Sequence, residues 1–409
     1  MKEQSELMQE LIDNANIPAL SLSWYQKGTR YAVAYGKTDI SAPSCVDTNT
    51  LFQAASLSKP VSAAIILDLI AQGKWDLDTP LADIADYGPL ELRQDPNYRT
   101  LTTRMVIGQC SGLANYGQDG DDGTKFIATP NTRFTYSGVA LDFLQQVIEK
   151  KTGRAWEEIA QDFFKRANMK RSTFRQLPDG RLNGIRLEVA SAHMENAPLP
   201  LLRDDAPGVL AGGMLTTAED YISFLQYCFK NDYLKSTLLT GTLSKLPLTI
   251  SPETSRVQWG LGMGIYRDAE KAIAFHWGNN RGSISFCAMD IETGDCVVNF
   301  SNSMNGPSVF QLVAEPIVGN IQPLFQWLST YCGFNDISSS KAPDTIATAV
   351  DSIHLLAIKE QADKSDEETN RFKHSVQQVT ASDMGQAFFQ ESKKEFSNSS
   401  PLEATPRPR

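Results

Sequence analysis

The stretch ASLSKPV, residues 55–61, decides the fold. A short apolar segment, LFQA, precedes it, and the apolar run SAAIILDLIAQG follows it. The helical spacing of that run, with Gly73 as a stop signal, predicts a helix that begins near Ser56. Lys59 follows Ser56 by three residues, so the two side chains share one face of the predicted helix.

Ser56 at a helix N-terminus is suited to nucleophilic chemistry. There, unpaired backbone N–H groups and the positive end of the helix dipole stabilise a developing oxyanion. Lys59 can activate the serine only if desolvation or a neighbouring cation keeps part of the lysine neutral. A Ser-x-x-Lys match alone is weak, since Ser338 to Lys341 also matches, in a polar segment without the flanking strand and helix.

The composition narrows the classes of partner and cofactor. The 409 residues carry a formal charge of −10, which argues against nucleic acid as the main partner because phosphate binding needs a basic surface. The six cysteines form no Cys-x-x-Cys pair, so neither a zinc site nor a disulfide framework is predicted. We expect no cofactor and no metal.

The N-terminal segment MKEQSELMQELIDNANIP alternates charged and apolar residues and lacks the apolar core of a secretory signal. No apolar run reaches the roughly 20 residues that a membrane-spanning helix needs. We therefore expect a cytoplasmic protein without a membrane span, or one exported by a route other than Sec.

Strand patterns stand at both ends of the main part of the chain. They are ALSLSWYQ and RYAVAYGK before Ser56, and GLGMGIYRD, KAIAFHWG, GSISFCAMDI and CVVNFSN after residue 259. Because these strands must pair, we expect an α+β fold with one antiparallel sheet from the N- and C-terminal segments, flanked by helices. A mostly helical lobe would span about 75–250, within a domain of residues 1–335.

Residues 336–409 are polar, charged and poor in aromatic residues, which predicts a tail without a core of its own. One amphipathic helix followed by disorder is expected there. The acidic cluster DKSDEETNR resembles the C-terminal signals of bacterial type IV secretion substrates. The tail is therefore either a linker without a role or a segment that binds a protein partner or the secretion machinery.

Several segments in order resemble one family. They are FQAASLSKPVSAAIILDLIAQGKWDLDTPLADI, LTTRMVIGQCSGLANYG, PNTRFTYSGVALDFLQQVIEKKTGRAWEEI, APGVLAGGMLTTAEDYISFL and WGLGMGIY with FHWGNNRGSISFCAMDIETGDCVVNFSNS. The chain resembles the penicillin-recognising serine hydrolases, which include class C β-lactamases, D-alanyl-D-alanine carboxypeptidases, D-aminopeptidases and esterases. The resemblance spans about residues 5–335 and implies a β-lactamase-like fold.

The resemblance also implies roles for individual residues. Ser56 would be the acylated nucleophile, Lys59 its activating partner, and Tyr136, directly before a predicted helix, the shared general base and acid. Taken alone, a tyrosine at such a position is more often a packing residue. His276-Trp277-Gly278 would edge the cleft, and the backbone N–H groups of Ser56 and Asn279 would form the oxyanion hole.

Two departures from the family pattern bear on the substrate. The family's Tyr-x-Asn is here Tyr136-Ser137-Gly138, so no amide side chain is present to bind an acylamino group. The family's Lys-Thr-Gly or His-Thr-Gly is here His276-Trp277-Gly278, in which an indole replaces a small hydroxyl residue and a histidine is a weaker anion partner than lysine. Trp277 would add an apolar wall for an acyl chain or an aromatic alcohol.

These features favour an esterase that works through an acyl-enzyme and acts on a small-molecule or peptide acyl substrate. If an alcohol or an amine replaced water, the same site would be an acyltransferase. Two alternatives stay open: a D-amino-acid peptidase or β-lactamase, and a catalytically silent scaffold or secreted effector that binds a partner through the lobe or the tail.

Overall fold

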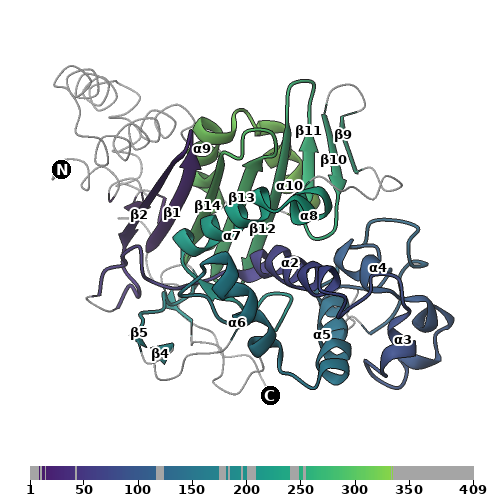
Figure 1. The fold of residues 1–409 in the computed structure, drawn as a ribbon. Coiled ribbons are helices and arrows are strands. Elements are labelled where there is room, and N and C mark those ends of the chain that lie inside the picture. The colour runs from purple at the N-terminus through teal and green to yellow at the C-terminus, as the bar shows by residue number, and fades with distance from the viewer. Residues whose placement is uncertain are drawn as a thin grey trace, which may run out of the picture.

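The computed structural model describes most of the predicted catalytic domain. It covers Gln9, residues 12–13, and residues 15–334 without 42–43, 117–123, 175–180, 183–184, 195–196, 200–208, 240–247, 252–254 and 333. The predicted tail, with its helix, therefore lies outside the described residues. Figure 1 shows a central sheet with helices packed on both faces.

The central sheet has eight strands in the order β2-β1-β14-β13-β12-β11-β10-β9, and every neighbouring pair is antiparallel. Leu20 of β1 lies opposite Ser301 of β14, so the N- and C-terminal segments meet inside one sheet, as predicted. The strands are β1 (Ala19–Gln26), β2 (Thr29–Gly36), β9 (Leu248–Ser251), β10 (Ser255–Trp259), β11 (Gly264–Arg267), β12 (Ala272–Asn280), β13 (Ser283–Asp290) and β14 (Cys296–Ser301).

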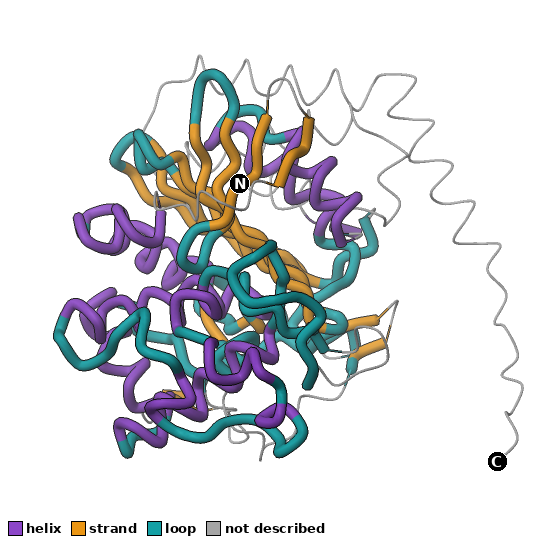
Figure 2. Tube along the Cα trace, turned by 90° about the vertical axis from the view of Figure 1, so that its right-hand side faces the viewer, coloured by secondary structure: helices purple, strands orange, loops and turns teal. Residues whose placement is uncertain are grey.

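Both faces of the sheet are apolar. Successive side chains of a strand point to opposite sides, so each strand contributes apolar side chains to both faces. In β13, Phe286 and Ala288 pack with the C-terminal helices, whereas Cys287 and Met289 pack with the remaining helices. Figures 1 and 2 show the two helical layers with the sheet between them. The C-terminal layer contains α9 (Pro307–Val318) and α10 (Gln322–Cys332), which Gly319 separates at a φ of 78°.

The other layer carries the remaining helices. Helix α7 packs directly on β1 and β14, and β9 belongs to the sheet, so part of the range 75–250 lies on the sheet itself. The helices are α2 (Ser58–Ala71), α3 (Leu81–Ile84), α4 (Thr103–Ile107), α5 (Gly138–Thr152), α6 (Trp156–Ala167), α7 (Ala218–Lys230) and α8 (Asp232–Leu234). Two-residue strands pair as β3 (Phe52–Gln53) with β8 (Leu215–Thr216), β4 (Arg181–Leu182) with β5 (Ile185–Arg186), and β6 (His193–Met194) with β7 (Ala197–Pro198).

Helix α5 follows Tyr136, as the sequence predicts, and both of its ends are capped. The Ser137 hydroxyl caps the N-terminus by accepting a hydrogen bond from the Ala140 N–H, and Gly153 leaves the helix in the left-handed region at a φ of 65°. Serine at the N-cap satisfies a backbone donor that the helix leaves free, and glycine adopts positive φ without a steric penalty. Tyr136 is therefore held next to a well-defined helix start.

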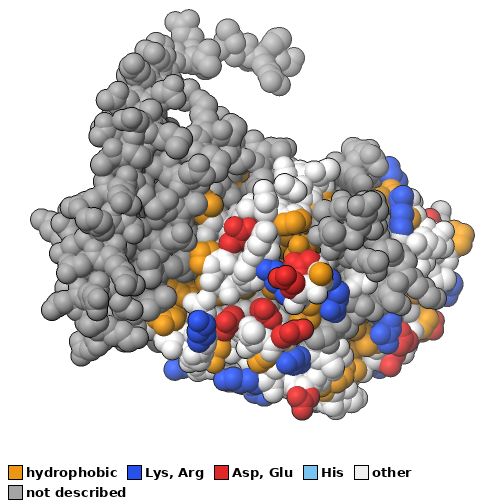
Figure 3. All heavy atoms as spheres, turned by 90° about the horizontal axis from the view of Figure 1, so that it is seen from above, with side chains coloured by type: hydrophobic (Ala, Val, Ile, Leu, Met, Phe, Trp, Pro, Cys, Tyr) orange, Lys and Arg blue, Asp and Glu red, His pale blue; other side chains and the backbone are white. Residues whose placement is uncertain are grey.

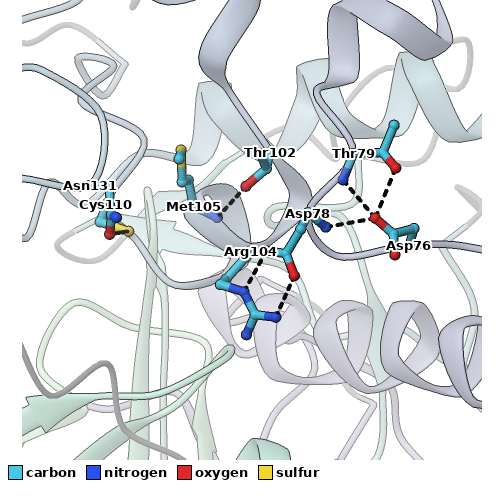
Figure 4. Close-up of polar contacts among 8 residues, drawn as sticks. All are labelled: Asp76, Asp78, Thr79, Thr102, Arg104, Met105, Cys110 and Asn131. Carbon is cyan, nitrogen blue, oxygen red and sulfur yellow. Dashed lines mark hydrogen bonds and ion pairs between the residues drawn. The ribbon is translucent and has the colours of Figure 1, made fainter.

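A small polar cluster fixes the short helix α4 (Figure 4). The Asp76 carboxylate accepts hydrogen bonds from the backbone N–H groups of Asp78 and Thr79, which shapes the turn. Arg104 of α4 then makes two hydrogen bonds of 2.7 Å to the two carboxylate oxygens of Asp78. This exposed pair adds at most about 1 kcal/mol to stability, but it sets the position of α4, which leads into Gln109 beside the Tyr136 loop.

The described surface is mixed in charge. Figure 3 looks down from the top of Figure 1 and shows acidic and basic side chains interspersed on the described part of that face. Among the residues that the structure describes, no helix combines the length and the apolar composition that crossing a membrane requires.

Candidate active site

Ser56 lies in a short 3-10 turn, Ala55–Leu57, that runs directly into α2. The preceding residue, Ala55, has a φ of 49°, in the left-handed region that residues with a side chain rarely adopt. Such a conformation costs of the order of 1–3 kcal/mol and persists where the surrounding structure enforces it. The Ser285 hydroxyl of β13 contributes by donating a 2.7 Å hydrogen bond to the Ala54 carbonyl. Ser56 itself is half-buried.

Lys59 is buried at 4% exposure, and its Nζ atom lies next to Ser56. Nζ donates one 2.8 Å hydrogen bond to Ser56 Oγ and another of 2.8 Å to the Ala211 carbonyl oxygen. Burial lowers the pKa of Lys59 to about 7, and the nearby Asp142 carboxylate acts in the opposite direction. The neutral amine that activation of the serine requires is therefore populated near neutral pH.

Tyr136 completes this group from the loop before α5. Backbone hydrogen bonds hold the loop: the Ser137 N–H donates to Gln109 Oε1 at 2.7 Å and the Gly138 N–H to Asn115 Oδ1 at 2.8 Å. The Nζ atom of Lys59 lies 5.0 Å from the centre of the Tyr136 ring, within the range of a cation–π interaction.

The Tyr136 hydroxyl is buried and makes no hydrogen bond within 3.5 Å to any described residue. Burial raises the pKa of Tyr136, although Ser56 lies near enough to act in the opposite direction. Tyr136 is consequently a neutral phenol at physiological pH. It can donate a proton, whereas Lys59 is the group that is poised to accept one.

His276 lies on β12 and is fully buried. Its Nδ1 atom is 2.7 Å from the Trp277 carbonyl oxygen. A carbonyl only accepts, so Nδ1 carries the proton and Nε2 is left as a buried acceptor that has no partner among the described residues. Burial, with a further contribution from Lys59, lowers the pKa of His276 to about 3, so the ring is uncharged near neutral pH.

Gly278 is the point where β12 touches the turn that carries Ser56. A Cβ atom at Gly278 would lie 2.2 Å from Ser285 Oγ, 2.7 Å from the Ala54 carbonyl oxygen and 3.0 Å from Ala55 Cβ. Only glycine allows this approach, and it brings the next residue, the exposed Asn279, to the edge of the site. The role of the Ser56 and Asn279 N–H groups as an oxyanion hole stays a prediction.

Trp277 sits in an aromatic cluster and is 5% exposed. Its indole stacks on the Tyr136 ring at 5.3 Å between centroids and contacts Trp327 and Tyr331 of α10 edge-on. Little of its surface is therefore available to a substrate. Trp277 supports Tyr136, and the more exposed aromatic surface beside it belongs to Tyr331, at 40%.

Sequence reasoning missed Asp142 and Tyr116. Asp142 lies on α5, and its carboxylate is close enough to Lys59 for each to shift the pKa of the other. The Tyr116 hydroxyl donates a hydrogen bond to Asp142 Oδ2. The Tyr116 ring also fills the space beside Gly138, where an added Cβ would lie 2.5 Å from a ring carbon. No local sequence pattern marks this carboxylate, because Tyr116 reaches it from another segment.

We looked for a metal centre among the described residues. Across the ranges that the structure describes, no three His, Cys, Asp or Glu residues are grouped so that they could hold a metal ion.

Comparison with known proteins gives distant relatives and clear structural neighbours. Penicillin-binding protein 4 of Amycolatopsis lactamdurans is 24% identical over 231 residues, which cover 51% of this chain and 58% of that protein. The chain thus spans less than two thirds of the length of the curated relatives it matches.

Two solved structures share the fold. The octameric penicillin-binding protein homologue from Pyrococcus abyssi aligns with a TM-score of 0.61 at 20% identity, covering 74% of each chain. A D-amino acid amidase from Ochrobactrum anthropi aligns with a TM-score of 0.57 at 20% identity, covering 74% of this chain and 91% of the amidase. These likenesses confirm the predicted β-lactamase-like α+β fold.

The sequence also matches the Beta-lactamase family over residues 5–317, which is more than half of the chain. The resemblance inferred from its motifs is confirmed, and the chain belongs to the beta-lactamase family of serine hydrolases.

Proposed function

We propose that the chain is an esterase that acts through an acyl-enzyme on Ser56. The observation that carries the proposal is the 2.8 Å contact between Ser56 Oγ and Lys59 Nζ, in a site where burial lowers the pKa of Lys59 to about 7. A hydroxyl next to an amine that is partly neutral at working pH is an activated nucleophile.

In the proposed reaction, the neutral Lys59 amine takes the Ser56 proton while Oγ attacks the ester carbonyl carbon. The backbone N–H groups of Ser56 and Asn279 stabilise the oxyanion. When the tetrahedral intermediate collapses, the carbon–oxygen bond to the alcohol breaks, and Tyr136 protonates the leaving oxygen and regains a proton from Lys59. Water then attacks the acyl-enzyme by the same steps, which release the acid and restore the Ser56 hydroxyl.

Two features of the site support a neutral ester over a β-lactam or a D-alanyl peptide. Gly138 offers no amide for an acylamino group, and the Tyr116 ring takes the space where such a side chain would start. His276 is uncharged near neutral pH, so it gives a substrate carboxylate no cation to pair with. An ester also needs less protonation of its leaving group than an amide does, which suits a site with one phenolic acid.

The test is a substrate panel run on the full chain and on Ser56→Ala. It contains p-nitrophenyl acetate, butyrate and octanoate, the chromogenic cephalosporin nitrocefin, and p-nitroanilides of D-alanine and D-phenylalanine. We expect Ser56-dependent turnover of the nitrophenyl esters, with kcat/KM at least about tenfold above that for the cephalosporin and the anilides. If Ser56→Ala still turns over a substrate, that activity does not use Ser56 and does not support the proposal.

The same panel decides the alternatives. Ser56-dependent turnover confined to nitrocefin would make the chain a β-lactamase, and turnover confined to the D-amino-acid anilides would make it an amidase or a peptidase. An alcohol acceptor that raises product release and appears in a new ester would identify an acyltransferase. No turnover of any member by folded protein would favour the scaffold, with the lobe or the tail as its binding surface.

A further inference from the structure

Asp142 lies near Gly138, the position at which the family pattern has an asparagine. It follows Gly138 by one turn of α5, so its side chain projects from the same helix face. The Tyr116 ring packs against Gly138 and its hydroxyl reaches Asp142 Oδ2. The absent side chain at Gly138 is thus matched by a ring that fits only beside glycine and that holds a carboxylate further along the helix.

The second oxygen of that carboxylate is unusual. Asp142 Oδ1 is buried and has no hydrogen-bond partner among the described residues. A buried carboxylate oxygen without a partner is costly unless a nearby cation compensates for it. The nearby cation is Lys59, whose charge acts on Asp142 across the site.

Lys59 and the helix that carries Asp142 are also tied to one neighbouring loop. The Ala211 carbonyl accepts the 2.8 Å hydrogen bond from Lys59 Nζ, and the Leu210 N–H donates a 2.9 Å hydrogen bond to Gln145 Oε1, one turn of α5 beyond Asp142. The loop is fixed from α2, because the Ser62 hydroxyl donates a 2.9 Å hydrogen bond to the Leu210 carbonyl. The loop therefore joins α2, which carries Lys59, to α5, which carries Asp142.

We propose that Asp142, held by Tyr116, is a positioning residue that serves as the counter-ion of Lys59. Its carboxylate favours the ammonium form of Lys59 and so offsets part of the effect of burial. Lys59 must be neutral to take the Ser56 proton and must then hold that proton as an ammonium until Tyr136 passes one to the leaving group. A counter-ion that balances the two forms near working pH serves both steps.

The other groups that face Lys59 do not supply this balance. Ser56 in the 3-10 turn and Tyr136 before α5 are neutral near pH 7, and His276 on β12 is uncharged. Tyr116 touches Asp142 and is a neutral donor. Among these groups Asp142 alone brings a negative charge, and burial raises its own pKa to about 6, so it is ionised where Lys59 titrates.

The first experiment reads Lys59 directly and needs no activity. The titration of Lys59 is followed by NMR in ¹³Cε-lysine-labelled full chain, with the signal assigned by its loss in Lys59→Met. Asp142→Asn is expected to move the Lys59 midpoint to lower pH, because the charge that favoured the ammonium is gone. Asp142→Glu keeps the charge and should restore much of the midpoint. Asp162→Asn, which removes an exposed carboxylate on α6 that pairs with Arg154, is the matched control and should change nothing.

The second experiment rests on the proposed function and follows the rate of inactivation by a fluorophosphonate against pH. In Asp142→Asn, the inactivation rate is expected to rise at lower pH than in wild type. The variant should therefore react several-fold faster at pH 6 and at the same rate, within about twofold, at pH 9. Tyr116→Phe should shift the pH dependence of inactivation in the same direction but by less, because Asp142 is harder to ionise without the hydrogen bond from the Tyr116 hydroxyl.

An Asp142→Asn variant with an unchanged Lys59 midpoint, or a shift that Asp162→Asn reproduces, would overturn the inference. A wild-type chain that never reacts with the probe would instead refute the proposed function, and the NMR titration would still decide the role of Asp142.

Discussion

Lys59 Nζ lies 2.8 Å from both Ser56 Oγ and the Ala211 carbonyl oxygen. The carbonyl can only accept, so one N–H of Lys59 points to Ala211 in either protonation state. When Lys59 is an ammonium it can donate to Ser56, and when it is neutral its lone pair can face the serine hydroxyl. The same geometry therefore serves the resting site and the step that removes the serine proton.

The rate of acylation should rise with pH through about 7. Lys59 acts as the base in its neutral form, and its pKa is lowered to about 7, so activity is low below that value and levels off above it. The measurement is kcat/KM for a nitrophenyl ester from pH 5 to pH 9. A rate that is flat across this range would mean that Lys59 does not titrate as the base.

Replacing Lys59 with methionine should stabilise the fold at low pH. Because the folded-state pKa lies below the ordinary value of 10.5, the unfolded chain binds more protons between about pH 7 and 10.5, and stability rises across that window. Burial of the charge therefore costs most below pH 7. Urea unfolding should give Lys59→Met a higher free energy of unfolding than wild type at pH 6 and a smaller advantage at pH 9. An advantage that grows with pH would contradict the assignment.

Gly278→Ala should damage both stability and activity. The added methyl group meets the Ala54 carbonyl oxygen and Ser285 Oγ at distances that require β12 or the Ser56 turn to move. Overpacking of this kind costs about 1–3 kcal/mol. Thermal unfolding should report the loss, and reaction with the fluorophosphonate should fall by more than about tenfold. Gly28→Ala, at an open turn, is the control for the loss of a glycine, and it should leave the probe reaction intact.

Restoring the family's asparagine at Gly138 should fail unless Tyr116 is shortened. The Cβ of Gly138→Asn would lie 2.5 Å from the Tyr116 ring, so the single variant is expected to unfold at lower temperature. The double variant Gly138→Asn/Tyr116→Ala should recover much of that loss. A single variant that is as stable as wild type would show that the ring does not occupy this space firmly.

The predictable part of the site came from one local pattern and from the family resemblance. The apolar run that ends at Gly73 predicts the helix at whose start Ser56 and Lys59 lie, and the family resemblance adds Tyr136 and His276. The structure brings these four side chains together, although their catalytic roles stay predictions. The sheet was predictable as well, because β1, β12, β13 and β14 each carry a strand pattern in the local sequence.

The rest depended on contacts between segments. Asp142 matters only because Tyr116 reaches it from another loop and Lys59 lies near it on another helix, which no local pattern reveals. The side of β12 that Trp277 occupies depends on strand register, and a one-residue shift exchanges the two faces.

The most direct test of the central claim is the intact mass of the chain after exposure to a fluorophosphonate, for wild type, Ser56→Ala and Tyr136→Phe. The account predicts one adduct on wild type and none on Ser56→Ala. On Tyr136→Phe the adduct should form within about tenfold of the wild-type rate, because fluoride leaves without the proton that Tyr136 gives to an alcohol. An adduct that persists in Ser56→Ala, or folded wild-type protein that acquires none, would contradict it.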